Sequence, residues 1–175
     1  MKAPELQASE WFNTDKDLKI SDFEGKVLVI EAFQMLCPGC VSHGVPLAQK
    51  IERTFPHDQV AVIGLHTVFE HHEAMTPVSL AAFLHEYRIT FPVGVDMASD
   101  TAMPLTMQAY HMRGTPSLVL IDKEGQLRAQ HLGDVSELQL GAEIANLVGE
   151  RVAVRVDDDP TQVNLGQCNA DGCTV

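Results

Sequence analysis

Two cysteines separated by two residues, Cys37-Pro38-Gly39-Cys40, have the type and spacing most typical of chemistry in this sequence. They follow an apolar run at residues 27–33 and precede a segment with helical character. Unpaired backbone N–H groups at a helix N-terminus stabilise a thiolate. We therefore expect Cys37 to be an exposed nucleophile. Cys40, one turn further on, would be the shielded thiol that resolves a mixed disulfide.

Metal binding is the rival interpretation of the two cysteines. Zinc sites usually combine two such pairs or add nearby histidines. Three of the eight histidines, His66, His71 and His72, cluster in one polar segment. A copper or zinc carrier that uses Cys37, Cys40 and a loop histidine such as His71 therefore stays open as an alternative. A polar rim around a substrate groove is the other role for these histidines.

The segments that must position these residues alternate between apolar runs and stretches with helical spacing. The runs predict strands at residues 27–33, 60–65, 91–95, 117–121 and 126–132, with a further short strand at 10–12. Helices are predicted at 41–55 with a kink at Pro46, at 78–87, at 101–111 and at 136–148, besides a single turn at 21–24. This order predicts an α/β domain with a central mixed β-sheet flanked by helices.

The chain changes character after Gly149. We expect one domain over residues 1–149 and a short C-terminal extension over residues 150–175 that carries a second pair, Cys168 and Cys173. A flexible tail of this length spans on the order of 25 Å, so the second pair is within reach of Cys37. An electron relay and an incidental tail are both open for this pair. Residues 151–156 are compatible with an added edge strand.

Composition excludes several classes of protein. Hydrophobic residues make up 45% and charged residues 21% of the chain, which is ordinary globular usage. The 24 acidic and 12 basic side chains give a net charge of -12, which argues against nucleic acid and against an anionic membrane surface. No apolar stretch is long enough to span a membrane, and the start does not resemble a secretory signal. We expect a cytoplasmic protein without a cofactor, although a chain whose signal had been removed would look the same.

Several segments together carry a family resemblance. They are Ala3-Pro4, the run from Ser21 to Val27, and Met112-Arg113-Gly114-Thr115-Pro116-Ser117 followed by Leu120-Ile121-Asp122-Lys123-Glu124-Gly125. With the two cysteines, they make residues 3–149 similar to the thioredoxin superfamily. The chain most resembles the TlpA-type redoxins, bacterial thiol–disulfide oxidoreductases related to the AhpC/TSA group. The resemblance implies a thioredoxin-like fold.

The resemblance also implies roles for individual residues. Pro116 would be a cis-proline that faces the dithiol, and Thr115 would offer its backbone to an extended substrate. Pro38 and Gly39 would complete the substrate-binding surface. Glu31, six residues before Cys37, would exchange a proton with Cys40, unless it reaches solvent at a sheet edge. The partners implied are proteins with disulfides or dithiols and an upstream reductant, and a homodimer is compatible with the sequence.

The sequence departs from the family pattern at two places. Leu36 stands where these proteins usually have Trp, and Pro-Gly separates the cysteines, so the redox potential stays open. Peroxiredoxins share the fold but need Thr or Ser three residues before the peroxidatic cysteine and Pro four further upstream. Neither cysteine has these residues in place, which argues against peroxidase chemistry of that kind.

Overall fold

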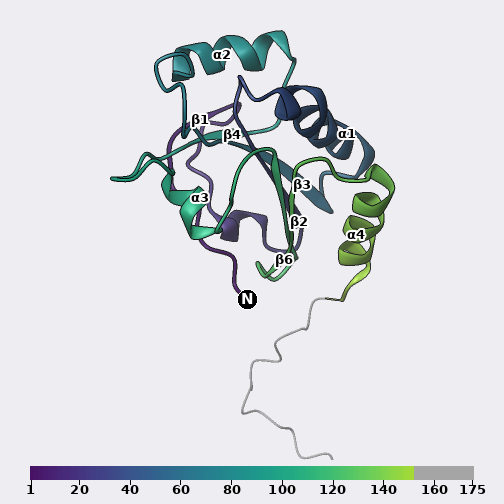
Figure 1. Ribbon diagram of the computed structural model, residues 1–175. Coiled ribbons are helices and arrows are strands. Elements are labelled where there is room, and N and C mark those ends of the chain that lie inside the picture. The colour runs from purple at the N-terminus through teal and green to yellow at the C-terminus, as the bar shows by residue number, and fades with distance from the viewer. Residues whose placement is uncertain (152–175) are drawn as a thin grey trace, which may run out of the picture.

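A computed structural model describes residues 1–151, which form a mixed six-stranded sheet with helices on both faces (Figure 1). The strand order is β1-β4-β3-β2-β5-β6. The strands are β1 (Ala8–Phe12), β2 (Val27–Phe33), β3 (Val60–His66), β4 (Val93–Asp96), β5 (Ser117–Ile121) and β6 (Leu127–Leu132). Strands β2, β3 and β4 are parallel, whereas β1, β5 and β6 run antiparallel to their neighbours. The predicted fold class is confirmed.

Strand β2 is apolar at every position except Glu31, because helices cover both of its faces. Val27, Val29 and Phe33 point into one core. Leu28 and Ile30 point into the other. Alternating side chains of a strand face opposite sides of the sheet, so a strand with both faces buried shows no polar alternation.

The helices are α1 (Val45–Thr54), α2 (Pro77–Glu86), α3 (Leu105–Ala109) and α4 (Glu137–Gly149), with a short 3-10 turn η1 (Ile20–Phe23). Side chains of α1, α2 and α4 contribute to the first core, and α3 and η1 contribute to the second. Figure 1 shows α3 on the opposite side of the sheet from α1 and α4.

The structure corrects the prediction of a continuous helix over residues 41–55. A π-helical turn, η2 (Cys40–Gly44), comes first, and α1 begins at Val45. Pro46 therefore lies in the first turn of α1 and not at a kink in its interior. Proline is tolerated there because the backbone N–H groups of the first helical turn have no partner within the helix.

The helix predicted at 101–111 is also shorter in the structure, where α3 spans Leu105–Ala109. Pro104 is its N-cap, and the residue before a proline is disfavoured in helical conformation. The buried Asp96 carboxylate accepts the N–H groups of Thr106 and Met107 at 2.8 and 3.0 Å. Proline and this carboxylate together fix where α3 starts, and periodicity alone does not reveal either effect.

None of the helices within residues 1–151 combines the length and apolar character needed to cross a membrane. Helix α4 ends at Gly149, where the sequence places the end of the domain. The predictions for the extension, including the strand at 151–156 and the pair Cys168 and Cys173, concern residues 152–175 and lie outside the described residues. They stay predictions.

Candidate active site

The dithiol lies where β2 leaves the sheet. The Cys37 N–H donates to the Gln34 carbonyl at 3.2 Å, which forms a tight turn after the strand. Val41 N–H in turn donates to the Cys37 carbonyl at 3.1 Å, so the chain turns directly into η2. Cys37 is half-buried, and Cys40 has 0% of its surface exposed. One thiol is accessible to another molecule, while the second lies beneath it.

Two contacts surround the Cys37 sulfur. The Cys40 N–H donates to Cys37 Sγ at 3.2 Å, and Cys37 Sγ donates to the Thr115 carbonyl at 3.5 Å. A backbone N–H aimed at sulfur favours the thiolate over the thiol. Burial, and in second place the hydrogen bond with Cys37, raise the pKa of Cys40 to about 12. The two sulfurs are therefore chemically unequal.

Pro116 packs against the turn that holds the cysteines. The Thr115–Pro116 peptide bond is cis, as the resemblance implied. A Cβ atom on Gly39 would lie 3.3 Å from Pro116 Cδ, and a Cβ atom on Gly44 would lie 2.8 Å from Pro116 Cβ. The absence of these two Cβ atoms lets the proline loop approach the dithiol. Pro38 is exposed at the surface beside it.

Glu31 lies below the dithiol in the middle of β2, between Gly64 of β3 and Leu118 of β5. Its side chain is 1% exposed, and Oε1 has no hydrogen-bond partner among residues 1–151. Burial, and next the negative charge of Cys37, hold the pKa of Glu31 well above its usual value. The alternative in which Glu31 reaches solvent at a sheet edge is wrong. Glu31 is thus a buried carboxyl group that senses the charge of Cys37.

Gly44 is a site residue that sequence reasoning missed. A Cβ atom there would collide with Glu31 Oε1 and lie 3.1 Å from Glu31 Cδ. The sequence holds a signal for it, since glycine is a poor helix former and occurs here inside a helical pattern. Only the structure shows that Gly44 lies between Pro116 and Glu31.

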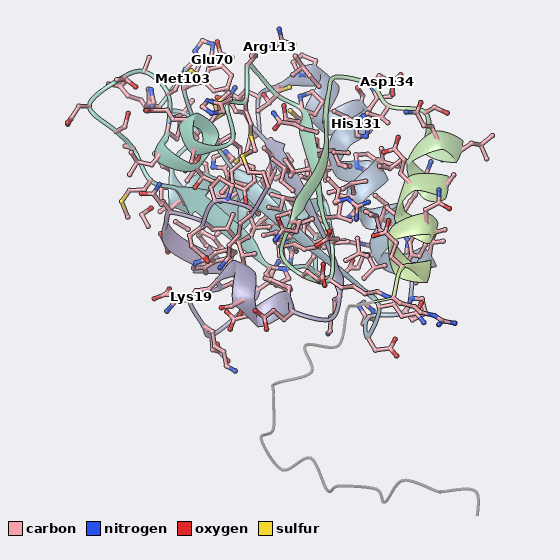
Figure 2. The ribbon with its side chains drawn as sticks, turned by 90° about the horizontal axis from the view of Figure 1, so that it is seen from below. Lys19, Glu70, Met103, Arg113, His131 and Asp134 are labelled. Atoms are coloured by element: carbon pink, nitrogen blue, oxygen red, sulfur yellow. The ribbon has the colours of Figure 1, made fainter. Side chains whose placement is uncertain are left out.

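The histidine-rich loop, residues 67–76 between β3 and α2, lies next to the dithiol turn. Phe69 N–H donates to Gln34 Oε1 at 3.2 Å, and Gln34 Nε2 donates to Glu70 Oε1 at 3.4 Å. Figure 2 shows Glu70 at the same edge of the molecule as Arg113, two residues before Thr115. His71 and His72 are exposed in this loop. The polar rim that they were expected to form stays a prediction.

The set of Cys37, Cys40 and His71 is not brought together as a metal site. Across the described part of the chain, no three side chains of His, Cys, Asp or Glu are close enough to hold a metal ion. His66 is buried behind the loop, beside Phe33 at a ring-centroid distance of 5.4 Å. Burial lowers the pKa of His66 to about 4. Nothing in this geometry favours the carrier over the enzyme.

Comparison with known proteins places this geometry in a family. The sequence model of the AhpC/TSA family matches residues 1–130. The crystal structure of the thioredoxin-like superfamily protein SPOA0173 has 73% sequence identity and a TM-score of 0.86, over 87% of this chain and 99% of that one. A thiol-disulfide isomerase from Corynebacterium glutamicum has 49% identity and a TM-score of 0.81, over 85% and 98% of the two chains.

A curated relative is much longer than this chain. NHL repeat-containing protein 2 of Homo sapiens is 25% identical over 138 residues, which are 77% of this chain but 18% of that protein. The chain thus spans less than a fifth of that relative's length. The match to residues 1–130 covers most of the domain, including the dithiol, the cis-proline and Glu31. The chain belongs to the AhpC/TSA family and is a thioredoxin-like redoxin.

Proposed function

We propose that this chain reduces or exchanges disulfide bonds in partner proteins through Cys37 and Cys40. The observation that carries the proposal is the inequality of the two sulfurs. Cys37 is partly accessible and receives the Cys40 N–H at 3.2 Å, whereas Cys40 is fully buried. A two-step exchange needs this arrangement, because one thiol must be accessible to the substrate and the other must stay shielded until the mixed disulfide has formed.

The proposed reaction moves two electrons. The Cys37 thiolate attacks one sulfur of a substrate disulfide, forming a mixed disulfide and releasing the other substrate sulfur as a thiolate that takes up a proton. Cys40 then loses its proton and attacks Cys37 Sγ, which releases the second substrate thiol. The substrate disulfide is reduced and a Cys37–Cys40 disulfide forms. An upstream dithiol reductant returns the pair to its starting state.

Glu31 is the group that we propose as the proton acceptor for Cys40. Burial raises the pKa of the Cys40 thiol, so a base that takes its proton assists the resolving step. The raised pKa of Glu31 brings its carboxyl closer to the proton affinity of a thiol than an exposed glutamate would be. Glu31 then passes the proton on when the site opens to solvent.

Thr115 and Pro116 would form the platform on which the substrate lies. The Thr115 carbonyl is already next to Cys37 Sγ at 3.5 Å, so a polypeptide that reaches the sulfur must pass this backbone. Pro38, exposed, and Gly39, half-buried, border the same opening. An extended substrate segment suits it, because such a segment presents free backbone groups to the loop.

The experiment that tests this proposal is reduction of insulin disulfides with dithiothreitol as the electron donor. The wild-type chain should accelerate the reaction, and Cys37→Ser should remove the acceleration. Cys40→Ser should instead accumulate a covalent mixed disulfide that mass spectrometry detects. Failure of the wild type to reduce insulin or other protein disulfides would exclude the proposal, and stoichiometric copper or zinc binding lost in His71→Ala would favour the carrier.

A further inference from the structure

Gln34 is a buried amide at the point where β2 turns toward the dithiol. Its side chain is 1% exposed, although it follows a strand made almost wholly of apolar residues. A buried amide is costly unless its polar atoms find partners. Gln34 finds both of them in the histidine-rich loop, with Oε1 accepting from Phe69 N–H at 3.2 Å and Nε2 donating to Glu70 Oε1 at 3.4 Å.

The same residue also contacts the dithiol turn through its main chain. The Gln34 carbonyl accepts the Cys37 N–H at 3.2 Å. One residue thus holds the cysteine turn by its backbone and the loop by its side chain. A second backbone bond, from Thr67 N–H to the Phe33 carbonyl at 3.0 Å, fixes the start of the loop but not its outer part.

The outer part of the loop is where a large substrate must make contact. Residues 70–74 are exposed, and Glu70 lies at the same edge of the molecule as Arg113, which precedes Thr115 by two residues (Figure 2). Because Cys37 is only half-exposed, a protein that brings a disulfide to its sulfur also touches the neighbouring loops. A small disulfide molecule reaches the same sulfur without that contact.

We propose that Gln34 is a positioning residue that sets the loop 67–70 against the cysteine turn and thereby determines how well protein substrates dock. This inference rests on the proposed function. It assigns to Gln34 an effect on the binding of large substrates and not on the reactivity of the thiols. Loss of the side-chain bonds leaves the backbone bond to Cys37 in place, so the two effects are separable.

The test compares two substrates in steady-state kinetics. Gln34→Met has nearly the same length and removes both side-chain bonds. It should raise KM for insulin about five- to tenfold, the effect of one or two lost hydrogen bonds. It should leave kcat for insulin, turnover of bis(2-hydroxyethyl) disulfide and the reduction potential near the wild-type values. Gln49→Met is the matched control, because Gln49 donates to the Tyr87 and Arg88 carbonyls on another surface.

A second pair of variants tests the hydrogen bond between Gln34 and Glu70 at its exposed end, where a substitution does not endanger folding. Glu70→Ala removes the acceptor for Gln34 Nε2 and should raise KM for insulin. Glu70→Gln keeps an amide oxygen as acceptor and should restore the wild-type KM for insulin. Equal KM values for the wild type and Gln34→Met, equal losses with insulin and the small disulfide, or equal effects of the two Glu70 variants would each overturn the inference. An inactive wild type would overturn the proposed function instead.

Discussion

The carboxyl of Glu31 lies directly against the main chain of Gly44, so closely that a Cβ atom on Gly44 would lie 3.1 Å from Glu31 Cδ. The contact joins the centre of the sheet to the last residue of the π-helical turn that carries Cys40. The buried acid, the turn and Pro116 therefore share one tightly packed space. A change in any of them has consequences for the others.

Gly44→Ala is predicted to damage both stability and activity. The new Cβ would meet Glu31 and also lie 2.8 Å from Pro116 Cβ, so the turn must move away from the sheet. Overpacking of this kind costs about 1–3 kcal/mol of unfolding free energy. Urea unfolding would measure this loss, and we expect insulin reduction to fall about tenfold or more with it.

Gly141→Ala is the matched control for this substitution. Gly141 is also helical, in α4, and a Cβ atom on it would have no neighbour within 4 Å in the part of the chain described. The change should stabilise the protein by about 0.5–1 kcal/mol, since alanine favours helix over glycine. Similar losses at Gly44 and Gly141 would show that the close approach at Gly44 has no special effect.

Glu31→Gln should raise stability while it lowers activity. A raised pKa means that the folded state holds its proton more tightly than the unfolded state does. Stability due to Glu31 is therefore fully present below its unfolded pKa and is lost as pH rises through the folded pKa. The glutamine variant has no proton to lose, so its stability advantage should grow with pH, and urea unfolding at pH 5 and pH 8 would measure this.

The kinetic effect of the same variant separates its catalytic role from its structural one. Without a base near Cys40, the resolving step should slow about 10- to 100-fold, while formation of the mixed disulfide by Cys37 should change little. Rapid-quench measurement of the two steps distinguishes them. A variant that resolves at the wild-type rate would remove Glu31 from the mechanism.

The sequence predicted the sheet and the dithiol because both leave local signals. The apolar run at 27–33 and the spacing of Cys37 and Cys40 need no knowledge of distant residues. The roles of Gly44 and Gln34 were missed, because each depends on a partner far away in the sequence, Pro116 for the first and Glu70 for the second. Spacing within one segment carries no information about such contacts.

The short α3 has a similar explanation. Its start is determined by the Asp96 carboxylate, which accepts N–H groups of the first turn, and by Pro104 at its N-cap. The metal alternative also could not be decided from spacing. Strand β3 lies next to β2, so the loop after β3 that carries His71 begins beside the segment that leads to Cys37. The sequence does not show whether the His71 side chain approaches the thiols.

The burial of His66 predicts that the folded protein loses stability in acid. Both ring nitrogens lack hydrogen-bond partners among the described residues, and burial lowers the pKa of His66 to about 4. Between its ordinary pKa and this value, only the unfolded state takes up a proton, so stability present above pH 6.5 is lost as pH falls. The loss should reach about 3 kcal/mol near pH 4.

His66→Leu should abolish this acid-dependent loss, because leucine has no proton to gain and no polar atom to leave unpaired. Urea unfolding between pH 4 and pH 7 would measure the difference. The control is His72→Leu in the loop that follows β3, where the side chain is exposed and its replacement should leave the pH dependence of stability unchanged. A wild-type curve that runs parallel to that of His66→Leu would contradict the burial of a neutral imidazole.

The inequality of the two thiols predicts selective alkylation. At pH 8, iodoacetamide should modify Cys37 at least about 100-fold faster than Cys40, because thiolates react and the pKa of the buried Cys40 is raised to about 12. Peptide mapping by mass spectrometry distinguishes these two sites from Cys168 and Cys173. In 8 M urea the difference should vanish, since both thiols are then solvated. In Cys40→Ser the backbone N–H of residue 40 still faces Cys37 Sγ, so the rate at Cys37 should be retained. Equal rates at Cys37 and Cys40 in the folded protein would mean that the two sulfurs do not have the separate roles proposed for them.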